Sequence, residues 1–202
     1  MINDLLDKMI PNPVCELNYN RDYEMLMAVV LSAQATDKEV NRVTKLLFKY
    51  SLESIAHMDI TKLEGIIKSV GTYHRKALYI KEIANRLIND YQGLVPNNRK
   101  YLESLPGVGH KSCNVFLSEY YHEPAIAVDT HILRVCKRLG ITKLQDDVTI
   151  TEKKLMKLIP KEKWSRTHLQ LVLFGRYTCK SRNPLCDECL FKSRCLLPTK
   201  KN

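Results

Sequence analysis

Apolar residues recur at intervals of three and four along most of this chain, a spacing typical of amphipathic helices. No persuasive run alternates apolar and polar residues in the way that a half-buried strand does. Thr36 or Asp37 is placed to cap one helix, and Gly71 and Gly140 are placed to end two others. The fold class expected is all-α. The predicted helices cover residues 23–34, 36–50, 63–71, 74–91, 100–105, 111–121, 129–140, 151–159 and 164–177.

The chain carries an excess of positive charge. Its 202 residues include 32 Lys and Arg against 22 Asp and Glu, which gives a formal net charge of +10. A field of this sign favours an anionic partner, either a nucleic acid or an anionic membrane surface. A basic surface that meets only solvent would have the same composition, so charge alone decides little. A chain of this length forms one large domain or two small ones.

No targeting or membrane-spanning segment is expected. Residues 1–13 contain Asp4 and Asp7 and lack the continuous apolar core of a signal peptide. The longest apolar runs, such as residues 28–31, fall far short of the roughly 20 residues that a membrane-spanning helix needs. We therefore expect a cytoplasmic protein that makes no use of a membrane.

A glycine turn, LPGVG at residues 105–109, runs directly into His110, Lys111 and an apolar helical pattern. Its glycines permit backbone angles that a side chain forbids, and a helix start has N–H groups without helical partners. Such a turn suits a phosphate oxygen. A nucleotide-binding P-loop would need glycines at positions 105 and 110, which are Leu105 and His110 here. The turn is therefore a plain connector between helices or a contact with a nucleic-acid backbone.

Four of the seven cysteines lie in one short segment, at Cys179, Cys186, Cys189 and Cys195. In a cytosolic protein this clustering favours metal ligation over disulfides. Four thiolates hold either zinc or an iron–sulfur cluster, and first principles do not choose between them. A structural zinc site usually has two Cys-x2-Cys pairs, whereas only Cys186 and Cys189 form such a pair here. The three scattered cysteines are expected to be free thiols.

Motifs in a definite order connect these features. They are VLSAQATDKEVN at 30–41, LPGVGHKSCNV at 105–115, AVDTHILRVCKRLG at 127–140 and GRYTC at 175–179. Together they resemble the endonuclease III family of helix–hairpin–helix DNA glycosylase/lyases, which act on oxidised pyrimidines. The resemblance covers most of the chain and implies two helical lobes that flank a DNA-binding cleft.

The resemblance also implies how the lobes divide the sequence. A six-helix barrel lobe that contains the helix–hairpin–helix would comprise residues 15–123. Residues 1–14 and 124–202 would form a second lobe with a four-cysteine loop at 179–195. The spacing of the cysteines resembles the family's [4Fe-4S] loop, which implies this cluster rather than zinc.

The partner implied is double-stranded DNA that contains an oxidised pyrimidine or an abasic site, so the protein would work at the nucleoid. Basic residues beside the cysteines would meet phosphates. We expect a monomer, because no oligomerisation stripe remains once the helices are packed.

Lys111 and Asp129 are the catalytic residues that the resemblance implies. Without it, Lys111 is an ordinary surface charge and Asp129 an N-cap of the helix that follows. The positive end of a helix disfavours an ammonium, which would favour the neutral, nucleophilic amine of Lys111. An anionic Asp129 would stabilise the positive charge that builds on the deoxyribose as the base leaves. The implied scheme is attack by Lys111 at C1′, a Schiff base, and β-elimination that nicks the strand 3′ to the lesion.

DNA contacts are predicted at two places. Gln34 would fill the space that a flipped nucleotide leaves in the duplex, although a polar residue at a helix end is also common. The hairpin would contact the DNA backbone through Gly107, Val108, Gly109 and His110.

One position departs from the family pattern. Relatives often carry a leucine wedge where this chain has Thr72, and an apolar wedge separates stacked bases better than a short hydroxyl side chain. We therefore expect a difference in flipping efficiency or in the choice of opposite base. The basic run His74, Arg75 and Lys76 that follows is expected to contact the DNA backbone.

The alternative functions differ in whether they require a lysine at position 111. Adenine glycosylases for mispairs generally lack this lysine and carry an additional C-terminal domain, and thymine mismatch glycosylases are also expected to lack it. A non-enzymatic helix–hairpin–helix module with a zinc-stabilised tail would need neither Lys111 nor Asp129. The lysine therefore favours the bifunctional enzyme.

Overall fold

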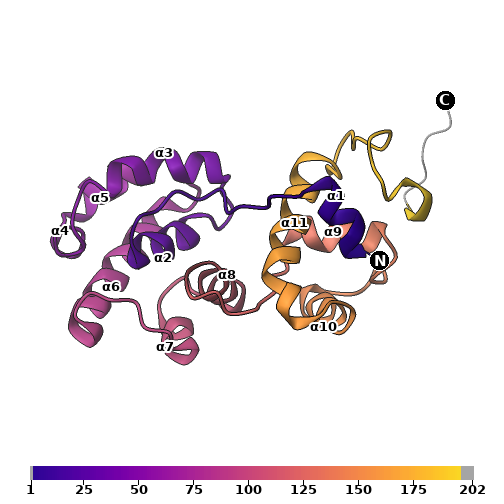
Figure 1. Ribbon diagram of the computed structural model, residues 1–202. Coiled ribbons are helices and arrows are strands. Elements are labelled where there is room, and N and C mark those ends of the chain that lie inside the picture. Colours follow the sequence, from indigo (N-terminus) through magenta and orange to yellow (C-terminus); the bar gives the residue numbers. More distant parts are fainter. Residues whose placement is uncertain (1, 197–202) are drawn as a thin grey trace. The chain divides into compact units, whose positions relative to one another are not determined.

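The computed structural model describes residues 2–196, and its regular structure is entirely helical (Figure 1). Because no strand occurs within this range, the predicted all-α fold class is confirmed. No helix within residues 2–196 is long and apolar enough to cross a membrane. The elements are α1 (Ile2–Met9), α2 (Asp22–Leu31), α3 (Asp37–Leu47), α4 (Leu52–His57), α5 (Ile60–Ile67), α6 (Tyr73–Tyr91), α7 (Arg99–Ser104), α8 (His110–Tyr120), α9 (Thr130–Arg138), α10 (Val148–Leu158), α11 (Trp164–Tyr177) and the short 3-10 helices η1 (Lys161–Lys163) and η2 (Lys192–Arg194).

The chain forms two compact units. One, which we call the hairpin unit, comprises residues 16–121 and holds α2 to α8. The other, the terminal unit, comprises residues 1–15 together with 122–202 and holds α1 and α9 to α11. The assignment of a barrel lobe and a cluster lobe with boundaries at 15–123 stays a prediction.

Helix α2 is the central element of the hairpin unit. Every residue from Asp22 to Leu31 is buried, as its nearly unbroken apolar sequence requires. Its two buried carboxylates are satisfied by neighbouring backbone. Glu24 Oε2 accepts a hydrogen bond of 2.7 Å from the Asn20 N–H, and Asp22 Oδ2 accepts one of 2.7 Å from the Val95 N–H. Helices α3, α6 and α8 pack against α2.

The terminal unit joins segments that are far apart in the sequence. Leu6 of α1, Ile132 of α9 and Phe174 of α11 are each 0% exposed in one apolar core. Helix α1 lies beside α11 (Figure 1). The Asn3 amide of α1 donates a hydrogen bond of 2.7 Å to Thr167 Oγ1 of α11, within this interface.

Helix ends agree with the sequence where a capping side chain is present. Thr36 Oγ1 accepts a hydrogen bond of 3.3 Å from the Glu39 N–H and begins α3. Helix α2 ends at Leu31 rather than at residue 34, because residues 32–35 close a turn through the Ala35 N–H and the Ser32 carbonyl, at 3.1 Å. The sequence pattern did not predict α1 and α4, which have only 8 and 6 residues.

Candidate functional site

The glycine turn between α7 and α8 is packed tightly onto its own unit. Gly107 has a φ of +79°, in the left-handed region that favours glycine. A Cβ at this position would lie 2.7 Å from Tyr79 Cδ2 and 3.1 Å from Val30 Cγ1. Val108 is buried, and its N–H donates a 3.1 Å hydrogen bond to the Leu105 carbonyl. Its N–H therefore stabilises the hairpin, and a DNA contact by Val108 stays a prediction.

Helix α8 begins at a glycine. Gly109 is exposed and has no side chain to cap the first turn, whose first recorded backbone bond runs from the Cys113 N–H to the Gly109 carbonyl at 2.9 Å. The N–H groups of Lys111 and Ser112 precede that bond, and no side-chain cap at Gly109 accepts from them. The partial positive charge of the helix start favours an anion there.

Gly107→Ala should be much more destabilising than Gly109→Ala. A left-handed φ and the contact with Tyr79 together predict a loss of about 2–4 kcal/mol in the free energy of unfolding. Gly109 has a φ of −90° and nothing within 4 Å of a Cβ, so its substitution should cost less than about 1 kcal/mol. Urea unfolding of the two variants measures the difference, and equal losses would show that the turn repacks around a methyl group.

Lys111 and His110 occupy the first turn of α8, and both are exposed. His110 Nδ1 lies 3.6 Å from Glu103 Oε1 of α7, and its Nε2 lies 3.2 Å from the Asn114 amide nitrogen. His110 therefore bridges the two helices of the hairpin. Lys111 lies at the helix start, and its role as the nucleophile stays a prediction.

Asp129 is the N-cap of α9. Its Oδ1 accepts a hydrogen bond of 2.8 Å from the Ile132 N–H, and the residue is half-buried. The cap uses only Oδ1, so capping does not prevent the carboxylate from acting on a second partner. Asp129 belongs to the terminal unit and Lys111 to the hairpin unit, and their joint action stays a prediction.

Asp129→Asn and Asp129→Ala should separate capping from chemistry. Asparagine caps a helix as well as aspartate does, whereas alanine at this position costs about 1 kcal/mol. If Asp129 stabilises the sugar cation, both variants should slow base removal by roughly 10²-fold or more, because both remove the anion. Single-turnover rates and thermal unfolding of the two variants provide the measurement. A native rate in Asp129→Asn would reduce the role of Asp129 to capping.

Gln34 lies on the exposed turn that follows α2, with a φ of +56°. Thr72, just before α6, has a φ of +58° and is also exposed. The Gln34 carbonyl oxygen lies 3.6 Å from the position of a Cβ on Gly71, so the two turns adjoin. Both are places where a side chain is held in a backbone conformation that L residues rarely adopt.

The basic run after Thr72 does not act as one group. Arg75 is exposed, whereas His74 Nδ1 lies 2.9 Å from Glu64 Oε1. Lys76 is only 3% exposed, and its Nζ donates hydrogen bonds to the carbonyls of Leu31 and Ala33 at 2.8 and 2.6 Å. Burial lowers the pKa of the Lys76 ammonium. The predicted contact of Lys76 with the DNA backbone is therefore wrong, because its donors are used inside the protein.

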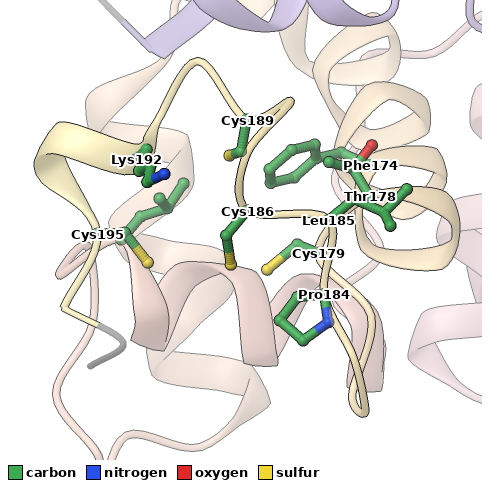
Figure 2. A pocket seen from close by; sticks show the side chains of 10 residues that line it. Phe174, Thr178, Cys179, Pro184, Leu185, Cys186, Cys189, Lys192 and Cys195 are labelled. Carbon is green, nitrogen blue, oxygen red and sulfur yellow. The ribbon is translucent and has the colours of Figure 1, made fainter. Parts of the chain in front are cut away.

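The four clustered cysteines line one pocket after α11 (Figure 2). Figure 2 shows their side chains arranged around a common space, with Phe174, Pro184 and Leu185 as apolar walls. Burial raises the pKa of the Cys189 thiol, and the charges of the other three thiols raise it further. Among residues 2–196, no three His, Cys, Asp or Glu side chains converge closely enough to hold a single metal ion.

Two arginines of α9 hold the first of these cysteines in place. Arg138 Nη1 donates hydrogen bonds to Cys179 Sγ at 3.3 Å and to the Lys180 carbonyl at 2.7 Å. Arg134 donates to the carbonyls of Cys179 at 3.1 Å and Gly175 at 2.7 Å. Burial lowers the pKa of the Arg134 guanidinium. Nothing in the sequence singles out either arginine.

Comparison with known proteins accounts for both the fold and the motifs. Residues 27–161 match the HhH-GPD superfamily of base excision DNA repair proteins. Endonuclease III of Bacillus subtilis strain 168 is 48% identical over 194 residues, which cover 95% of this chain and 89% of the relative. The chain belongs to the endonuclease III family. It is an enzyme of base excision DNA repair, a DNA glycosylase/AP lyase, and the resemblance inferred from the sequence motifs is confirmed.

Other members of the endonuclease III family match over the same extent. Endonuclease III of Escherichia coli K12 is 42% identical over 188 residues, which cover 92% of this chain and 88% of the relative. A solved trapped endonuclease III–DNA covalent intermediate, in an estranged-adenine complex, matches with a TM-score of 0.92 at 47% identity. That match covers 96% of this chain and 92% of the other. A thermostable thymine-DNA glycosylase, 24% identical with a TM-score of 0.81, shares the fold.

Proposed function

We propose that this protein removes oxidised pyrimidines from double-stranded DNA and then nicks the abasic site 3′ to the lesion through a Schiff base on Lys111. The observation that carries the proposal is the position of exposed Lys111, in the first turn of α8 directly behind a hairpin whose helix start has no side-chain cap. The covalent endonuclease III–DNA intermediate of a relative supports a covalent step here.

Each residue has a distinct part in the reaction. The hairpin of Gly107, Gly109 and His110 holds a backbone phosphate and sets the register of the DNA. The amine nitrogen of Lys111 forms a bond to C1′ of the deoxyribose as the glycosidic C–N bond breaks, and the base leaves with a proton that this amine gives up. The carboxylate of Asp129 stabilises the positive charge that builds on the sugar. Opening of the sugar ring gives a Schiff base, and loss of a C2′ proton with departure of the 3′ phosphate cleaves the strand.

The lesion must leave the duplex before it reaches Lys111. A damaged base that stacks poorly is the easiest to flip. Gln34 projects from an exposed turn and fills the space left in the stack, and Thr72 lies on the adjoining turn. A threonine there separates bases less strongly than an apolar wedge would.

We propose that the cysteine pocket holds a [4Fe-4S] cluster. A single zinc ion needs sulfurs about 2.3 Å from one point, whereas a cluster spreads its four thiolates over separate irons. The four cysteines that line one pocket, its apolar walls and the donor from Arg138 to Cys179 Sγ support the cluster. Cys179, Cys186, Cys189 and Cys195 would hold it. When bound, the cluster supplies a structural cross-link for the loop, and no step of base removal passes through it.

The partner we propose is duplex DNA at the nucleoid, bound by one protein molecule. Lys180, Arg182 and Arg194 are exposed on the cysteine loop and are available to phosphates. Lys192 is exposed as well, but its Nζ lies 2.7 Å from Asp187 Oδ1, which offsets its charge.

A panel of duplexes tests the proposal. The holoprotein is incubated with DNA that contains one thymine glycol, one abasic site, one G·T mispair or no lesion, with and without borohydride. We expect base release and a 3′ nick at thymine glycol, a nick at the abasic site, and a covalent adduct in borohydride. Release of thymine from the mispair without a nick would show a monofunctional mismatch glycosylase. Binding without release or adduct on any duplex would overturn the enzymatic proposal.

A further inference from the structure

We propose that Lys76 is a positioning residue for base removal, because its ammonium holds the turn that carries Gln34 in the conformation that enters DNA. The inference rests on the role proposed above for Gln34.

Lys76 is an unusual lysine. Lysines are almost never fully buried unless they are paired, yet Lys76 is 3% exposed and forms no ion pair with a carboxylate of the described residues. Its partners are instead the carbonyls of Leu31 and Ala33, at 2.8 and 2.6 Å. The end of a helix has carbonyls without helical partners and a partial negative charge, and both favour an ammonium. Lys76 therefore acts as a C-terminal cap on α2 that comes from a different helix.

The turn that Lys76 holds has a strained conformation. Its two acceptors flank Ser32, whose hydroxyl donates to the Val29 carbonyl at 2.8 Å. Gln34 follows Ala33 directly and has a φ of +56°, which a residue with a side chain adopts only where its surroundings enforce it. The bond from Lys76 to the Ala33 carbonyl fixes the peptide plane between Ala33 and Gln34. The direction in which Gln34 leaves the surface depends on that plane.

Lys76 also fixes the distance between two turns. Its own N–H bonds to the Thr72 carbonyl at 3.1 Å, so it belongs to the first turns of α6. The Gln34 carbonyl lies 3.6 Å from the Cβ position of Gly71 on the turn before α6. One side chain thus ties the turn of Gln34 to the turn of Thr72. If both turns enter the duplex, their separation has to match the spacing of the bases that they displace.

The expected consequence concerns flipping rather than bond cleavage. Without the ammonium, the turn samples more conformations and has to be ordered each time DNA binds. A smaller fraction of encounters with DNA is therefore productive. A lesion that is already unpaired needs no space filled in an intact stack. Loss of Lys76 should therefore slow base removal from a paired lesion and leave an unpaired lesion almost unaffected.

The experiment compares Lys76→Met with Lys76→Arg in single-turnover reactions of the holoprotein on thymine glycol, paired with adenine or placed in an unpaired bubble. We expect Lys76→Met to slow removal from the paired site by about 10-fold or more and from the bubble by less than about 3-fold. Arginine should restore much of the rate, because it still donates to both carbonyls.

Lys81→Met is the matched control. Lys81 lies on the same helix, and its Nζ donates to the Met58 carbonyl at the end of α4 with a distance of 2.7 Å. This substitution removes the same kind of bond away from the Gln34 turn, so it should leave the ratio of the two rates unchanged. If Lys76→Met fails to fold by circular dichroism, Lys76→Gln keeps a neutral donor and takes its place.

Gln34→Ala separates this inference from the proposed function. No effect of Gln34→Ala on either substrate would remove the role proposed for Gln34. A slowing by Gln34→Ala without one by Lys76→Met would overturn the inference about Lys76 alone. The inference about Lys76 is also overturned if Lys76→Met slows base removal from the paired and the unpaired lesion equally. It is overturned as well if the effects of Gln34→Ala and Lys76→Met on the rate multiply in the double variant. We expect the double variant to be no slower than the slower single variant, because both act on one turn.

Discussion

Lys111→Ala should abolish the protein–DNA adduct that borohydride traps on thymine glycol, and it should slow base removal by roughly 10³-fold or more. In the proposed reaction the amine nitrogen of Lys111 forms the bond to C1′, and alanine offers no replacement. Lys111 is exposed, so its loss should change the free energy of unfolding by less than about 0.5 kcal/mol. The hairpin and its backbone N–H groups stay in place, so the variant should still bind DNA.

Lys100→Ala controls for the loss of one positive charge. Lys100 is exposed on α7, on the other side of the same hairpin. Its substitution should weaken DNA binding slightly, with a change that disappears at high salt, and it should leave the adduct intact. An adduct that survives in Lys111→Ala would mean that another amine is the nucleophile. Base release by the native protein without any adduct would mean that water attacks the sugar.

The second large effect is expected from Cys189→Ala. If the four thiols hold a [4Fe-4S] cluster, the native protein should contain about four irons and four sulfides and absorb visible light, and the variant should lose both. Metal binding is coupled to folding, so loss of the cluster should cost several kcal/mol and disorder the loop from Cys179 to Cys195. Affinity for duplex DNA should fall, because the exposed basic residues on this loop lose their arrangement.

Cys15→Ser is the control for this prediction, since Cys15 lies far along the chain from the loop and does not line the pocket. Its iron content, visible spectrum and melting temperature should stay at the native values. One equivalent of zinc and no iron in the native protein would contradict the cluster. A native spectrum in Cys189→Ala would exclude Cys189 as a ligand.

The sequence predicts the helices well where periodicity is long and fails where tertiary contacts decide. No glycine or proline at residues 32–34 marks the end of α2, but the chain turns at Ser32. Lys76 looks like its exposed neighbour Arg75 in the sequence, and only the packing of α6 beside the end of α2 buries it.

In the candidate site, too, the sequence reveals local features but not contacts between distant helices. Local features such as the glycine turn, the cap at Asp129 and the spacing of the cysteines can be identified in the sequence because each lies within one segment. Arg134 and Arg138 are four residues apart on α9, which indicates that they share a face of the helix. The spacing does not indicate which segment that face contacts. They reach the Cys179 backbone because α9 packs closely on α11 at Gly175, where a Cβ would lie 2.9 Å from His131 Cβ. A contact between distant helices has no signature in a single sequence.

The division of the chain into units also sets the order in which it can fold during synthesis. The hairpin unit is continuous from residue 16 to 121, so it can fold as soon as its last helix leaves the ribosome. Helix α1 is made before the hairpin unit but buries Leu6 against residues of α9 and α11, so its apolar face stays uncovered until α11 has been translated. A chain whose translation stops before α11 would therefore present a folded hairpin and an uncovered apolar helix. Cellular proteases and chaperones recognise such exposed apolar segments, so incomplete copies would be removed before they compete for damaged DNA.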